Sequence, residues 1–237
     1  MFTASVRDGV LRLDRPDTEW LSTGWNGGPE RAPTAYNVSV PEGWPEVDLG
    51  AYAAQRRDRA GFDRPGPTLF TGVSLDHLRG ARCGPVEVYA TAGLSNPAAL
   101  PVPAPDVSPG DDSPPRDDDR GPAGTVNVFV GTARNLAGGA LANLVAVAAE
   151  VKAATLLSEA GVPGTTTDAI VVGHDPTGES VQFTGSATPV GAAARACVRE
   201  AVLASLRSRY PNREYPETVA AADHGVSTDR RAAVFRP

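Results

Sequence analysis

Apolar residues recur along the chain with two periods, one typical of strands and one typical of helices. A β-branched stretch at residues 126–130 precedes an apolar helical stretch at 139–159, and a second β-branched stretch follows at 169–173. Gly161 and Pro163 end the helix, because Gly favours the left-handed cap and Pro cannot continue a helix. A helical crossover of this length predicts that the two strands lie parallel in one sheet.

The helix in this unit is unusually apolar. Between Ala140 and Leu157, the polar side chains are Asn143, Glu150, Lys152 and Thr155. Such a helix is normally buried on most sides, so we expect Glu150 and Lys152 to be buried charges. They lie roughly 200° apart around the axis at about 3.6 residues per turn, so they cannot pair along one face. Each needs its own partner or a function, and an arginine partner for Glu150 is the structural alternative.

The remaining pattern predicts an α/β fold, a mixed β-sheet with packed helices in a single domain. Strands are expected at 5–13, 36–40, 68–74, 86–90 and 180–184, a short helix at 49–59, and a second long helix from Pro189. We expect 180–184 to form a hairpin with the strand at 169–173. The length of the chain favours one domain, built from residues 1–96 and 124–210.

Two segments differ from this domain in composition. Residues 97–123 hold eight Pro and six Asp with almost nothing to bury, which predicts a disordered acidic insertion in a surface loop. Deleting about residues 104–120 should leave folding and activity nearly intact. Residues 211–237 show little periodicity and are expected to form an irregular, partly disordered tail.

Charge and composition exclude several functions. A net charge of −6 argues against a nucleic-acid partner. The sequence contains no run of 18 apolar residues, so no membrane span is predicted. The basic residues are 21 Arg and one Lys, Lys152. So high a proportion of Arg, together with many Asp residues, is typical of a protein from a salt-loving source. Cys83 and Cys197 are isolated, which favours a reduced, cytoplasmic protein without structural zinc. We expect Cys197 in the core and His174 in a turn at the surface.

Candidate chemistry consists of carboxylates, hydroxyls and amides. Asp168 follows three threonines at 165–167, and a right-handed crossover leaves this turn at the opposite end of the sheet from Thr132. We place the chemistry at the turn because it offers several N–H and O–H donors beside one carboxylate. A carboxylate desolvated by apolar neighbours has a raised pKa and can act as a general acid or base, and a threonine beside it could be a nucleophile. Asp168 could instead only cap the turn.

Five segments resemble a known family, the adenosylcobinamide amidohydrolases of corrinoid salvage. They are LSTGWNGG (21–28), TAGLSNP (91–97), GTVNVFV (124–130), AAEVKAATL (148–156) and GTTTDAIVV (164–172), and the resemblance covers about residues 20–97 and 124–210. Thr166 and Ala169 stand where the family more often has Gly and Ser. The resemblance implies hydrolysis of the amide that joins aminopropanol to the corrin ring. It implies no metal cofactor from the protein, because cobalt arrives with the corrinoid substrate.

The roles of individual residues are inferred from their chemistry. We expect Glu150 or Asp168 to activate water, and Lys152 or the backbone N–H groups of turn 165–167 to hold the oxyanion. The predicted catalytic residues are Glu150, Asp168, Lys152 and Thr167; the predicted substrate-binding residues are Ser22, Asn26, Thr91, Ser95, Asn96, Asn127 and Thr165. Two alternatives remain, a corrinoid-binding carrier without catalysis and an acyl-transferring enzyme with a threonine nucleophile.

Overall fold

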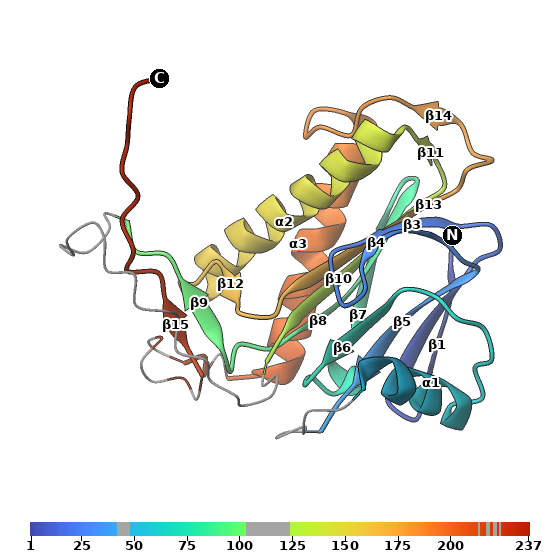
Figure 1. Cartoon of the computed structure of the whole chain (residues 1–237), viewed down its shortest axis with the longest axis horizontal. Helices are drawn as coiled ribbons and strands as arrows, with labels where there is room; N and C mark the ends of the chain where they lie inside the picture. Colours follow the sequence, from blue (N-terminus) through green and yellow to red (C-terminus); the bar gives the residue numbers. More distant parts are fainter. Residues whose placement is uncertain (42–47, 103–123, 213, 217–218, 220–221, 223) are drawn as a thin grey trace.

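Four layers of secondary structure stack in the order helices, sheet, sheet, helix (Figure 1). The structure is a computed structural model, and it describes residues 1–41, 48–102, 124–212, 214–216, 219, 222 and 224–237. Helices α2 and α3 cover one face of a six-stranded sheet, whose other face packs on a four-stranded sheet that α1 covers in turn. The predicted α/β class with a mixed sheet and packed helices is therefore confirmed.

The six-stranded sheet carries the central unit of the sequence. Its order is β4 (Gly28–Arg31), β3 (Glu19–Ser22), β13 (Ala169–His174), β10 (Val126–Thr132), β8 (Val86–Ala92) and β7 (Arg79–Cys83). Strands β10 and β13 are adjacent and parallel, as predicted, while the other neighbours in this sheet are antiparallel. The register pairs Asn127 with Ala169 and Thr132 with His174, so Asp168 and Thr132 lie at opposite ends.

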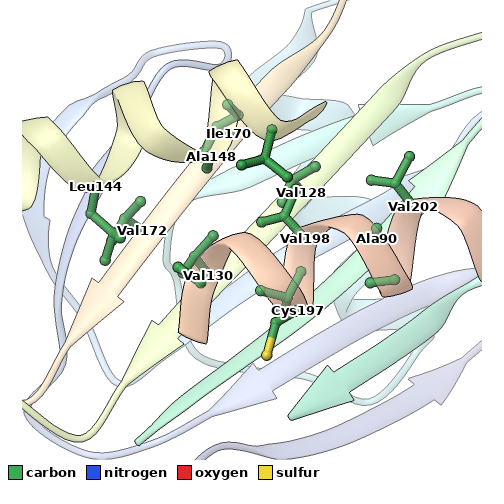
Figure 2. Packing of buried hydrophobic residues seen from close by; sticks show 14 of the residues in the cluster. Ala90, Val128, Val130, Leu144, Ala148, Ile170, Val172, Cys197, Val198 and Val202 are labelled. Atoms are coloured by element: carbon green, nitrogen blue, oxygen red, sulfur yellow. The ribbon is translucent and has the colours of Figure 1, made fainter. Parts of the chain in front are cut away.

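Helices α2 (Gly138–Ala160) and α3 (Pro189–Arg209) pack side by side on this sheet. Gly161 ends α2 with φ 73°, and the Thr188 side chain caps α3 just before Pro189, so both predicted boundaries are confirmed. Small and branched side chains fill the layer between helices and sheet. Figure 2 labels ten of them, namely Ala90, Val128, Val130, Leu144, Ala148, Ile170, Val172, Cys197, Val198 and Val202.

The four-stranded sheet has the order β1 (Thr3–Arg7), β2 (Val10–Asp14), β5 (Thr34–Ser39) and β6 (Thr68–Thr71). Leu11, Leu13, Trp20 and Phe129 belong to the core between the two sheets. The predicted short helix at 49–59 is confirmed as α1 (Leu49–Arg59), which packs on the outer face of this sheet. The single strand predicted at 5–13 is instead a hairpin, because Asp8 and Gly9 both adopt positive φ and reverse the chain.

Two small sheets depart from the sequence expectations. Strand β14 (Ser180–Val181) pairs with β11 (Asn135–Leu136), so the hairpin predicted between 169–173 and 180–184 is wrong. In the other sheet, β9 (Pro97–Ala99) lies between β12 (Gly164–Thr165) and β15 (Val226–Ser227).

The expected insertion and tail therefore both contribute a strand. For the residues of β9 and β15, the expectation of disorder or irregular structure is wrong. The remainder of the expected insertion, residues 103–123, lies outside the described residues, so its predicted disorder stays a prediction.

Helix α2 is long and apolar enough, by length and composition alone, to cross a membrane. Its 23 residues include a window of mean hydropathy 1.6, and no other helix among the described residues passes this test. In the fold, however, α2 packs against β13 and α3. A core helix of a globular domain has the same composition, so this helix is weak evidence for a membrane span.

Candidate active site

The centre of the candidate site is an ion pair between Lys152 of α2 and Asp168, the residue directly before β13. The Asp168 carboxylate also accepts hydrogen bonds from Val126 N at 3.0 Å, from Thr165 N at 3.0 Å and from the Thr165 hydroxyl. Both side chains of the pair are 11% exposed, so the pair lies just beneath the surface. Lysine at 152 is therefore buried against a carboxylate and does not extend into solvent.

Gly164 leaves the space that this pair needs. A Cβ at position 164 would lie 2.5 Å from Asp168 Oδ2 and 2.9 Å from Lys152 Nζ. Any larger residue would therefore push the ion pair apart. Because the turn Gly164–Asp168 also bonds to its own carboxylate, Asp168 caps the turn as well as holding the lysine.

A hydroxyl and amide network adjoins the ion pair. Asn96 Nδ2 donates to the Thr166 hydroxyl at 2.6 Å, and Thr166 N donates to the Asn96 carbonyl at 3.1 Å. The Thr167 hydroxyl bonds to the Thr125 hydroxyl and donates to the Gly124 carbonyl at 3.3 Å. Asn96 is 3% exposed, yet its Oδ1 has no hydrogen-bond partner among the described residues. The structure thus brings Asn96 and the threonine turn together, as the sequence predicted.

Asn127 and Thr91 lie on the other face of the six-stranded sheet. They form a buried chain between the two sheets, in which Asn127 Nδ2 donates to Asn37 Oδ1 at 2.9 Å and Asn37 Nδ2 donates to Thr91 Oγ1 at 3.0 Å. Asn127 pairs with Ala169, the residue after Asp168, and side chains alternate along a strand. Asn127 and Asp168 therefore leave the sheet in opposite directions. Sequence reasoning missed Asn37, whose only signal is an amide inside an apolar strand.

Glu150 does not join the ion pair. Its side chain is 61% exposed and pairs with Arg195 of α3 at 2.5 Å. The expectation that Glu150 is a buried charge is therefore wrong, and the alternative of an arginine partner is confirmed. The physical reason is the 200° separation on α2, because the side of the helix that brings Lys152 to Asp168 turns Glu150 away.

The glycine-rich loop at 22–28 reaches the same end of the sheet as Asp168. Thr23 N donates to the Ile170 carbonyl at 2.9 Å, and the Ser22 hydroxyl accepts from Gly24 N at 3.1 Å. Ser22 is buried, whereas Asn26 is exposed with φ 49°. This loop is the turn between β3 and β4, and it presents Asn26 at the surface.

His174 and Cys197 lie away from this site. His174 is buried at the opposite end of β13, where its Nδ1 accepts a hydrogen bond from Leu136 N at 3.2 Å, so its expected surface position is wrong. Burial lowers the pKa of the His174 imidazole, with Glu19 and Asp175 opposing that shift. Cys197 lies in the core as predicted, and burial raises the pKa of its thiol to about 11. A thiol in this state is a poor nucleophile.

The remaining predicted residues complete the inventory of the site. Thr165 is buried beside Asp168, Thr167 is exposed, and Ser95 is half-buried next to Asn96. Among the described residues, no group of three or more His, Cys, Asp or Glu side chains could hold a metal ion. The site therefore offers an ammonium group, a carboxylate, hydroxyls and an amide at one end of the sheet. This combination is suited to hydrolysis of an acyl derivative, because a cation and N–H donors can stabilise an oxyanion.

Comparison with known proteins identifies the family. Residues 3–214 match the family model of adenosylcobinamide amidohydrolase. The chain is 56% identical over 239 residues to the adenosylcobinamide amidohydrolase of Halobacterium salinarum, with all of both chains covered. It is 25% identical over 214 residues to that of Methanosarcina mazei, which covers 86% of this chain and 97% of the relative. The chain belongs to the adenosylcobinamide amidohydrolase family, and the resemblance seen in the sequence is confirmed.

Solved structures resemble the fold only distantly. A β-aminopeptidase from a Burkholderia species has a TM-score of 0.45 and 15% identity over 86% of this chain and 80% of its own. A protein from Pyrococcus horikoshii has a TM-score of 0.41 and 12% identity over 87% of this chain and 79% of its own.

Proposed function

We propose that this protein hydrolyses the amide bond between aminopropanol and the corrin ring of adenosylcobinamide. The products are adenosylcobyric acid, which re-enters cobalamin synthesis, and free aminopropanol. The observation that carries the proposal is full-length similarity to the Halobacterium salinarum adenosylcobinamide amidohydrolase. The two free cysteines are consistent with a cytoplasmic location, which stays a prediction.

The position of the ion pair supports a role for Lys152 in this reaction. Because both side chains of the pair are 11% exposed, the amide arm of the substrate can reach it while the corrin ring stays outside. The Lys152 ammonium group has three donors, of which Asp168 takes one. In the proposal, Lys152 stabilises the negative charge that develops on the carbonyl oxygen, and Asp168 fixes the position of Lys152 and of the Thr165 hydroxyl.

Asp168 is poorly placed to serve as the base itself. Its carboxylate accepts four hydrogen bonds, from Lys152, Val126 N, Thr165 N and the Thr165 hydroxyl. A carboxylate offers about four lone-pair sites, so these donors occupy its accepting capacity. Asp168 is therefore proposed as a positioning residue. Glu150 loses the ground for its assignment as a base, because that assignment rested on burial.

Product analysis tests the proposal. The protein is incubated with adenosylcobinamide, and adenosylcobyric acid is measured by chromatography. We expect Lys152→Met to reduce turnover at least about a hundredfold, the size expected for losing an oxyanion donor. The matched control is Arg199→Met, which removes an exposed cation paired with exposed Glu200 on α3 and should keep full turnover.

Three outcomes separate the alternatives. Corrinoid binding in a spectral titration without any product would overturn the proposal and favour a carrier. A covalent adduct on a threonine of the 165–167 turn, seen by intact mass during turnover, would favour a threonine nucleophile over direct attack by water. Full activity in Lys152→Met would place the chemistry elsewhere.

A further inference from the structure

The small sheet β12–β9–β15 assembles three distant parts of the chain beside the ion pair. Figure 1 shows these strands together near the C-terminal end of α2. Each strand adjoins a polar residue: β12 contains Thr165, β9 follows Asn96 directly, and β15 begins two residues after His224. The C-terminal segment is therefore part of the structure around the candidate site.

The register places His224 next to Asn96. Strand β15 runs parallel to β9 with Val226 opposite Ala98, and His224 N donates to the Ser95 carbonyl at 3.4 Å, so the pairing continues to His224 and Asn96. On the other side, β12 runs antiparallel to β9, and Thr166 N donates to the Asn96 carbonyl. Residues in register on neighbouring strands present their side chains on the same face. Asn96 thus lies between Thr166 and His224.

Two polar atoms at this position are buried and have no hydrogen-bond partner in the described part of the chain. They are Asn96 Oδ1, an acceptor, and His224 Nδ1. Buried polar atoms are nearly always paired in native proteins, and an exception calls for a specific explanation such as a catalytic role. The two residues lie just before the adjacent strands β9 and β15, and His224 N donates to the carbonyl of Ser95, the neighbour of Asn96, so one bound molecule could satisfy both atoms.

The chemistry described above lacks a group that can accept a proton from water. The Asp168 carboxylate is occupied by four donors, and Glu150 points outward to Arg195. Imidazole is the side chain that most often acts as a general acid and base. Neighbouring strands lie about 4.8 Å apart, so a substrate amide over Asn96 would have His224 on one side and the threonine turn on the other.

We infer that His224 is the general acid–base residue of the amide hydrolysis, supplied by the C-terminal segment through β15. The inference rests on the proposed function. The imidazole takes a proton from water as the water oxygen bonds to the carbonyl carbon. It returns that proton to the amide nitrogen as the C–N bond breaks, which leaves a carboxylic acid on the corrin arm and free aminopropanol. Asn96 Oδ1 accepts the N–H of the substrate amide and orients it.

Few other charged groups surround this position in the described residues. Strand β9 contributes no titratable side chain. Near the preceding segment, a Cβ at Gly93 would lie 3.3 Å from Arg209 Nε, and Tyr210 OH accepts from Leu94 N at 3.0 Å. The Lys152–Asp168 pair lies beyond the threonine turn. Arg209, Tyr210, Lys152 and Asp168 are therefore the other titratable groups to consider when the pH profile changes on replacing His224.

Kinetics of His224→Gln test the inference, with His77→Gln as the matched control. His77 is half-buried, contacts Ser208 Oγ at 3.1 Å and lies on the short helix Leu75–His77 against α3. We expect His224→Gln to lower kcat at least about a hundredfold with little change in KM, as for loss of a general base. The acid limb of the kcat/KM pH profile should disappear, and added imidazole should restore part of the rate. His77→Gln should keep the wild-type profile.

Several outcomes would overturn the inference. His224→Gln that keeps more than a third of kcat, or keeps the acid limb, rules out His224 as the acid–base residue. If the wild-type protein makes adenosylcobyric acid and His224→Gln stays active in this way, only the inference fails. If the wild-type protein makes no adenosylcobyric acid, the proposed function fails, and the inference fails with it. Should His224→Gln not fold, carbethoxylation of wild-type protein replaces it, with modified sites mapped by peptide mass. Activity retained in protein whose His224 is carbethoxylated would then refute the inference.

Discussion

Replacing either partner of the Lys152–Asp168 pair should destabilise the protein as well as inactivate it. Lys152→Met leaves the Asp168 carboxylate charged, nearly buried and without its cation. Removing one partner of a buried pair typically costs 3–5 kcal/mol, and the partial exposure of this pair favours the lower end, about 3 kcal/mol. Asp168→Asn should cost a similar amount, because one oxygen becomes an NH₂ group that faces hydrogen-bond donors.

A double-mutant cycle measures the coupling between the two residues. The free energy of unfolding is obtained from urea denaturation for wild type, Lys152→Met, Asp168→Asn and the double variant. We expect the double variant to lose less stability than the sum of the single variants, by about 1–3 kcal/mol, because neither buried charge remains. For a chain of this size, about 3 kcal/mol corresponds to a Tm decrease of about 6–12 °C. Activity is then compared at temperatures where each variant is fully folded.

The matched control for stability is again Arg199→Met. Its pair with Glu200 is exposed on both sides, so its loss should change the unfolding free energy by less than about 0.5 kcal/mol. Single variants whose effects simply add, or a Lys152→Met variant as stable as the control, would refute the reasoning. Either result would mean that Asp168 and Lys152 do not form a desolvated pair in solution.

Two other substitutions test the geometry at each end of the sheet. Gly164→Ala should lower both kcat and stability, because its Cβ would displace the ion pair, whereas Gly139→Ala meets open space at the start of α2 and should be neutral or slightly stabilising; equal effects would contradict the close approach. His174→Gln should weaken the pH dependence of stability. Burial lowers the pKa of His174 below its ordinary 6.5, so the unfolded chain binds the proton first and wild-type stability falls as pH drops below 6.5. Urea unfolding at pH 7.5 and 5.5 measures this, and identical pH dependence in both proteins would show that His174 contributes nothing.

The central crossover could be predicted because its signals are local. β-Branched strands, a helix with its Gly161 cap and a Pro189 start are each read from a few adjacent residues. The parallel pairing of β10 with β13 then follows from chain connectivity. The position of turn 165–167 and Asp168 at one end of the sheet could be predicted for the same reason.

Errors arose where burial or pairing depends on distant parts of the chain. Alanine tolerates exposure, so an alanine-rich helix does not reveal which face meets the sheet, and Glu150 was assigned to the wrong environment. Strands β9 and β15 are only a few residues long, and they pair with each other although they lie far apart in the sequence. No periodicity reveals them. The hairpin at Asp8 and Gly9 could have been recognised, since Asp-Gly is a strong signal for a tight turn.

The layered fold separates the parts that stabilise the protein from the parts that carry its chemistry. Three apolar cores fill the spaces between the four layers, and they hold the large buried side chains. The ion pair and the threonine turn lie at the end of the six-stranded sheet where β13 begins, next to short strands that belong to none of these cores. Substitutions of the exposed Thr166 and Thr167, or in the C-terminal segment, therefore leave the cores intact, which is why activity and stability can be measured separately there. Lys152, Asp168 and Gly164 are exceptions, because they form or border the nearly buried ion pair, and their replacement should affect both properties.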